Sequence, residues 1–179
     1  MNTWMFTNAD KAIEVIEYYK KNTAEADRYI IEGDLFVNYN RMSKAEQIKV
    51  DAFLLKDIGE YFFIDMLASY IRLDAAYPVL HSKFLKTRSR GKAAYAIACW
   101  RISRDKEIEK WIIEATRVSI PSNPIAAVSS GILNLIHMLG EMKTDDSILR
   151  LTELTHSENN LIAGIATRYL NELIPENPS

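Results

Sequence analysis

The chain has 179 residues, of which 48% are hydrophobic and 26% are charged, so it can bury a sizeable core and is expected to fold throughout. Its 22 basic and 24 acidic residues give a formal net charge of -2, which excludes a strong basic field for nucleic acid or anionic membranes. No apolar run reaches the roughly 20 residues that span a bilayer, and the N-terminus has no signal-peptide pattern. We therefore expect a cytoplasmic protein without a membrane segment.

The first third of the chain is predicted to be helical. Apolar residues recur at helical spacing, and no segment shows the alternation of a half-buried strand, which indicates an all-α fold. A first helix is expected over residues 9 to 21 with Asn8 as its N-cap, and a second over residues 24 to 39. The stretch SKAE, from Ser43 to Glu46, has the capping-box pattern, so a helix should begin there. Its apolar pattern continues to about residue 73, as two helices parted near residues 57 to 59.

Beyond residue 74 the pattern predicts helices separated by short polar turns. Pro78 and Pro124 fit the opening turns of two of them, where proline loses no helical hydrogen bond. In the helix that contains Pro124 the expected core stripe is Ile125, Val128, Ile132, Leu133 and Ile136. The predicted ranges are 75 to 87, 92 to 103, 105 to 117, 124 to 140, 145 to 155 and 159 to 173.

Three of these helices can be laid over one another. A branched or small residue is followed four positions later by two small residues, and then by a large aliphatic and a small polar residue. The equivalent sets are Ala94, Ala98, Cys99, Ile102 and Ser103; Ile125, Ser129, Ser130, Leu133 and Asn134; and Ile162, Ala166, Thr167, Leu170 and Asn171. Each is preceded by an amphipathic helix, so the predicted unit is a helix pair, and such pairs must pack side by side to bury both faces.

This pattern resembles the B helix of HEAT and HEAT-like repeats. The resemblance implies an α-solenoid, a right-handed-type stack of antiparallel helix pairs, with about three pairs over residues 74 to 174. Residues 1 to 73 would then be N-terminal helices and residues 175 to 179 a tail, all within a single domain. The alternative is an irregular α-helical bundle.

No residue pattern predicts catalysis, a cofactor or a metal. The histidines His81, His137 and His156 fall in different predicted repeats, without the ligand spacing that a metal site needs. Cys99 lies in an apolar run without a group that would activate its thiol, so we expect a reduced core cysteine. We therefore predict a protein that is not an enzyme.

The candidate partner-binding residues form three groups. The segment from Lys83 to Lys92 carries five cations and no acid, and two further arginines follow on the next helix. A stripe separate from the core carries Asn134, His137 and Glu141, and Asn171 is its counterpart in the last repeat. The basic residues are Lys83, Lys86, Arg88, Arg90, Lys92, Arg101 and Arg104, and the alternative acidic face is Asp51, Asp57, Glu60 and Asp65.

The HEAT-like resemblance implies a protein that binds another macromolecule. The leading hypothesis is a non-enzymatic protein-binding module, and its specific version is a bacterial immunity protein that neutralises a toxin domain by covering the active site. A basic surface would suit an acidic partner, whereas a nuclease toxin would suit the acidic face. The alternatives are a HEAT-like nucleic-acid-binding protein or DNA glycosylase-like enzyme, which the near-neutral charge disfavours, and an adaptor or chaperone subunit.

Overall fold

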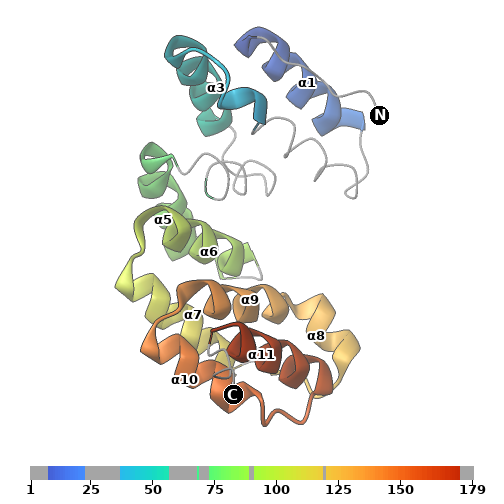
Figure 1. Cartoon of the computed structure of the whole chain (residues 1–179). Coiled ribbons are helices and arrows are strands. Elements are labelled where there is room, and N and C mark those ends of the chain that lie inside the picture. The colour runs from blue at the N-terminus through green and yellow to red at the C-terminus, as the bar shows by residue number, and fades with distance from the viewer. Residues whose placement is uncertain are drawn as a thin grey trace, which may run out of the picture. The chain divides into compact units, whose positions relative to one another are not determined.

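The computed structural model describes residues 8–22, 37–56, 68, 73–88, 91–118 and 120–173, and its regular elements within these ranges are all helices (Figure 1). Contacts group the chain into two compact units, residues 1–82 with 101–103, and residues 83–100 with 104–179. The single domain expected from the sequence stays a prediction. Within the described ranges, no helix has both the length and the hydrophobicity that crossing a bilayer requires.

In the first unit, α1 (Ala9–Asn22) packs against α3 (Lys44–Lys56). The side-chain oxygen of Asn8 accepts a hydrogen bond from the Lys11 amide at 2.9 Å, which confirms the predicted N-cap. The hydroxyl of Ser43 accepts from the Glu46 amide at 3.3 Å, as in a capping box. The Glu46 carboxylate bonds the Ala9 amide at 2.5 Å, so this carboxylate ties the starts of two helices together.

A 3-10 turn (Asp74–Ala76) leads into α5 (Tyr77–Lys86), and Pro78 lies in the first turn of α5 as predicted. The next helix is α6 (Gly91–Ser103), which contains the buried Cys99. The predicted core cysteine is therefore confirmed. The predicted second helix lies mostly outside the described residues, as does the break near residues 57 to 59.

The second unit is built around α9 (Ile132–Met142). This helix contacts each of its neighbours, and its buried residues include Ile132, Ile136 and Leu139. A helix that is apolar on most sides needs partners on most sides, which explains the surrounding layer. These partners are α7 (Lys106–Val118), α8 (Pro124–Ser130), α10 (Asp145–Leu154) and α11 (Asn160–Leu173) (Figure 1).

The helix predicted over residues 124 to 140 is two helices, because Gly131 turns the chain with a φ of 75°. This is the left-handed region, which glycine adopts without a steric penalty. Asn123 caps α8 by accepting from the Ala126 amide at 2.8 Å, and Pro124 lies in the first turn as predicted. The break resets the helical phase, so the apolar stripe of one helix does not continue into the other.

The exposure of α8 corrects the predicted core. Ile125 is 83% exposed and Val128 is 64% exposed, so placing these two residues in the core was wrong. Ala127 on α8 is fully buried, and the predicted burial of Ile132 and Ile136 is confirmed. Ile162, which was aligned with Ile125, is fully buried. These aligned positions do not share a buried environment, and repeat stacking stays a prediction.

The second unit is also tied together by polar side chains. Asn159, which is 2% exposed, donates from its amide nitrogen to the Pro121 carbonyl oxygen at 2.9 Å. Its side-chain oxygen accepts from the backbone amides of Leu161 and Ile162 at 3.1 and 3.4 Å. The same residue therefore caps α11 and holds the loop that precedes α8.

Candidate functional site

A pocket of about 460 Å³ opens between α7 and α10 in the second unit. Two of its lining residues are apolar, Ile113 on α7 and the half-exposed Leu149 on α10, and the other six are charged. Pockets for small molecules are mostly apolar with a few placed polar groups. This composition is more typical of a polar protein surface.

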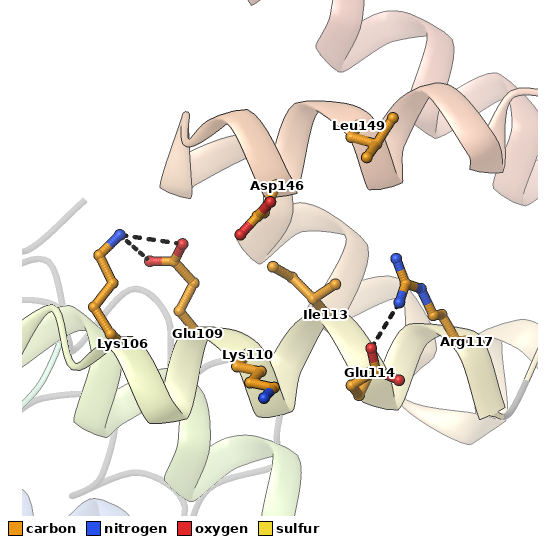
Figure 2. Close-up of a pocket in the computed structure, with 8 residues that line it drawn as sticks. All are labelled: Lys106, Glu109, Lys110, Ile113, Glu114, Arg117, Asp146 and Leu149. Carbon is orange, nitrogen blue, oxygen red and sulfur yellow. Dashed lines mark hydrogen bonds and ion pairs between the residues drawn. The ribbon is translucent and has the colours of Figure 1, made fainter.

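Most of the charges around the pocket are already paired. Lys106 contacts Glu109 at 3.3 Å, and Arg117 contacts Glu114 at 2.7 Å (Figure 2). Lys110 and Asp146 complete the lining, so three cations stand beside three carboxylates. The pocket thus has no net formal charge and offers little attraction for a ligand of one sign.

A buried guanidinium links α7 and α10 beside this pocket. Arg150, 7% exposed, donates from Nε to the Thr116 hydroxyl at 3.0 Å and from Nη2 to the Thr116 carbonyl oxygen at 2.6 Å. That carbonyl belongs to the last turn of α7, where helical partners are missing. Arg150 also pairs with Glu153 at 2.7 Å, and with Arg117 nearby it holds the pKa of Glu153 below its usual value. This network is structural.

Glu109 forms part of a second local network. Its side chain is 6% exposed and lies 3.5 Å from the indole nitrogen of Trp100. The Arg104 guanidinium lies 3.8 Å from the centre of the Trp100 ring. The carboxylate therefore accepts from a ring nitrogen and an ammonium, and Arg104 is engaged with an aromatic face.

Four of the five cations predicted between residues 83 and 92 have described positions. Lys83, Lys86 and Arg88 are exposed, and Lys92 is half-buried with its ammonium 4.6 Å from the centre of the Phe84 ring. We call these four residues the basic cluster. They share one unit, whereas Arg101 is grouped with the other and Arg90 lies outside the described residues. Arg101 and Arg104 take part in other interactions, so neither adds an unpaired charge.

The predicted polar stripe lies on α9 and meets α11. Asn134 and Glu141 are exposed, and His137 is half-buried. The His137 Nδ1 lies 2.7 Å from the Tyr169 hydroxyl, with the two rings edge to face. Burial and the nearby Arg168 charge lower the pKa of His137, which Glu141 partly opposes. Asn171 is exposed on α11.

Gly140 allows this contact between α9 and α11. A Cβ atom at this position would overlap the Tyr169 ring. The role of Tyr169 was not predicted from the sequence, because Tyr169 contacts His137, which lies 32 positions away along the chain. The small glycine in an otherwise large apolar run was the available signal for a close approach.

Of the four residues in the predicted acidic face, Asp51 has a described position. Asp51 accepts a hydrogen bond from the Tyr39 hydroxyl at 2.8 Å. Burial of Tyr39 and then this carboxylate raise the pKa of the phenol above its usual value. Asp57, Glu60 and Asp65 lie outside the described residues.

A separate apolar surface lies at α8. Large apolar side chains are exposed between residues 118 and 128 of the second unit, and Ile125 and Val128 lie one turn apart on α8. We call Ile125 and Val128 the apolar α8 face. The exposed large apolar side chains described in this stretch are Val118, Ile120, Ile125 and Val128.

The candidate chemical groups do not form a reactive centre in the described part of the chain. Burial raises the pKa of the Cys99 thiol to about 12, and Asp105 adds to this effect, so the reactive thiolate is disfavoured at neutral pH. Among the residues with described positions, no three His, Cys, Asp or Glu side chains gather where they could hold a metal ion.

Comparison of this chain with protein-family models, with curated proteins and with solved structures finds no match.

Proposed function

We propose that this protein is a non-enzymatic protein-binding module that uses the apolar α8 face. The observation that supports the proposal is that α8 buries a small side chain and exposes two larger apolar ones. Ala127 packs inward with no exposed surface, while Ile125 and Val128 point their larger apolar surfaces to solvent at 83% and 64% exposure. A helix that served the core alone would bury its large side chains and expose its small one.

Exposed apolar side chains that gather on a protein surface mark contact sites for other proteins. Val118, at the end of α7, is 82% exposed and extends this apolar character in the segment that leads to α8. Burying an aliphatic side chain in an interface removes its surface from water, with a gain of about 25 cal/mol per Å². The occupant that fits is a folded protein with an apolar recess.

The specific form of the proposal is an immunity protein that covers the active site of a toxin domain. Such an inhibitor needs a contact surface and no catalytic group of its own. The product of a gene beside this one is the first partner to test, because inhibitors are commonly encoded beside their targets. An adaptor or chaperone subunit would use the same kind of surface, so the identity of the captured protein separates these roles.

The test is affinity capture with the full chain from its native host, followed by direct binding of the purified partner. Replacement of Ile125 and Val128 by glutamate together should abolish capture, because two charges would enter an apolar contact. Both side chains are exposed, so the double variant should keep its fold and its helical circular dichroism.

The matched control replaces Val37 and Ile48 of the first unit by glutamate together, because these side chains are 47% and 58% exposed and both variants then gain two negative charges. This control should retain the partner. If both variants capture the same protein as wild type does, the apolar α8 face is not the binding surface. If wild type retains no partner, the protein-binding proposal itself fails.

A further inference from the structure

We infer that the basic cluster, Lys83, Lys86, Arg88 and Lys92, binds an acidic segment of a protein partner. This inference rests on the proposed protein-binding function and names the chemistry of one partner surface. The four cations come from the end of α5, the turn after it and the first turn of α6, all within one unit. They lie close along the chain and carry the same charge.

Several cations elsewhere in the described part of the chain form ion pairs with neighbouring carboxylates. Lys11 pairs with Glu14, Lys49 with Glu46 and Arg168 with Glu172, each within one turn of its own helix. Lys83, Lys86 and Arg88 have no ion pair within the described part of the chain. Their mutual repulsion is therefore left for a bound anionic group to relieve.

Lys92 is held in place by aromatic rings. Its ammonium lies 4.6 Å from the centre of the Phe84 ring and 5.4 Å from that of Trp111, and these rings meet edge to face at 5.2 Å. Ring faces orient a cation but carry no formal charge, whereas a carboxylate would neutralise the cation. The fold thus fixes Lys92 while keeping its formal charge uncompensated.

Helix electrostatics explains two of these residues but not Lys92. Lys83 and Lys86 lie in the last turn of α5, where the helix dipole favours a cation. Lys92 lies in the first turn of α6, where the dipole disfavours one. The helix dipole therefore does not account for a lysine at this position, whereas its contacts with the Phe84 and Trp111 rings and a role in binding an anion both do.

The aromatic arrangement favours protein carboxylates over single-stranded nucleic acid. Single-stranded nucleic acid binds best where aromatic faces are open for bases to stack. The Lys92 ammonium already lies over the rings of Phe84 and Trp111, and Phe84 is 6% exposed. The exposed Leu85, at 63%, adds an apolar contact point beside the cations.

The experiment measures binding of the full chain to a fluorescent glutamate-rich peptide at low and moderate salt. The cluster variant replaces Lys83, Lys86 and Arg88 together by glutamine. The matched control replaces Lys44, Lys56 and Lys143, exposed lysines outside the cluster, so both variants lose the same formal charge. We expect about tenfold weaker binding for the cluster variant, since three exposed charge contacts each contribute a fraction of 1.4 kcal/mol.

The control should bind the peptide within about twofold of wild type, because exposed charges that do not contact the peptide are screened by salt. Equal loss in both variants would overturn the inference by showing that net charge alone matters, and so would undetectable peptide binding by wild type at low salt. Tighter binding of a DNA duplex of matched charge would overturn it in favour of nucleic acid. The glutamate variant of the apolar α8 face should bind the peptide normally, so failure of this inference is distinct from failure of the proposed function.

Discussion

Helices α8 and α9 follow each other directly along the chain but use their apolar residues in opposite ways. On α9 the large side chains are buried, with Ile136 fully inaccessible, whereas on α8 Ile125 is 83% exposed. The two helices differ in phase because Gly131 separates them. An apolar stripe in the sequence therefore does not by itself identify a surface that is buried in the fold.

The largest expected effect comes from truncating one isoleucine on each helix. Ile136→Ala should lower the free energy of unfolding by about 2 to 5 kcal/mol, because it removes buried atoms and leaves a cavity. Ile125→Ala should change it by less than about 0.5 kcal/mol, because its side chain is already in solvent. Urea unfolding of the two variants measures the difference, and equal losses would remove the contrast between α8 and α9.

The next largest effect is expected from the hydrogen bonds of Arg150 on α10 to Thr116 on α7. Arg150→Met should lower the free energy of unfolding by about 1 to 3 kcal/mol. The buried carbonyl and hydroxyl oxygens of Thr116 would lose the guanidinium that donates hydrogen bonds to them. Arg117→Met is the control, because the Arg117 side chain is 44% exposed and its ion pairs should contribute less than about 1 kcal/mol. Thermal unfolding compares the two, and a larger loss in the control would contradict a structural role for Arg150.

The junction between α8 and α9 is tested with two glycines. Gly131→Ala should cost about 1 kcal/mol, because alanine is strained at a φ of 75° while its Cβ would meet no neighbouring atom. Gly164→Ala, inside α11 with equally open space, should instead stabilise by about 0.5 to 1 kcal/mol. Chemical unfolding of both variants gives the signs. The same sign in both would mean that the turn at Gly131 does not limit stability.

The smallest expected effect is the pH dependence from the outer stripe of α9. The folded pKa of His137 lies below its ordinary value, so the unfolded chain binds the proton first as the pH falls below about 6.5. The contribution of neutral His137 to the free energy of unfolding is therefore complete above that pH. It is lost as the pH falls from the unfolded pKa to the lower pKa of the folded state. It should stay well under about 1 kcal/mol, because solvent screens a partly exposed ring.

His137→Gln isolates this contribution, since His81 and His156 remain in the chain. Unfolding measured at pH 7.5 and 5.5, on the order of one pH unit either side of an ordinary histidine pKa, should show a smaller acid loss for the variant than for wild type. An identical loss in both proteins would assign the pH dependence to other groups.

Local signals in the sequence predicted the helices well. The caps at Asn8 and Ser43 and the proline positions are recorded in neighbouring residues, so these helix starts followed from the sequence. The phase change at Gly131 was missed because a lone glycine is tolerated within helices as well as at their ends. The exposure of Ile125 was missed with it, since periodicity alone does not identify what a stripe faces.

The long-range parts of the site could not be predicted. Arg150 and Thr116 are 34 positions apart, and neither has a neighbour pattern that points to the other. The basic cluster was visible as composition, but the rings that hold Lys92 come from separate helices and required the fold. The candidate surfaces thus depend on packing that a single sequence does not encode locally.

Asn159 couples the loop before α8 to the start of α11. Its side-chain nitrogen donates to the Pro121 carbonyl oxygen, and its side-chain oxygen accepts from the Leu161 and Ile162 amides. Displacement of this side chain would therefore release the loop before α8 and the start of α11 together. Slow hydrogen exchange at these two amides should therefore report opening of the α8 segment as well. A partner would meet an apolar face that is already ordered, and preorganisation of this kind lowers the entropy lost on binding.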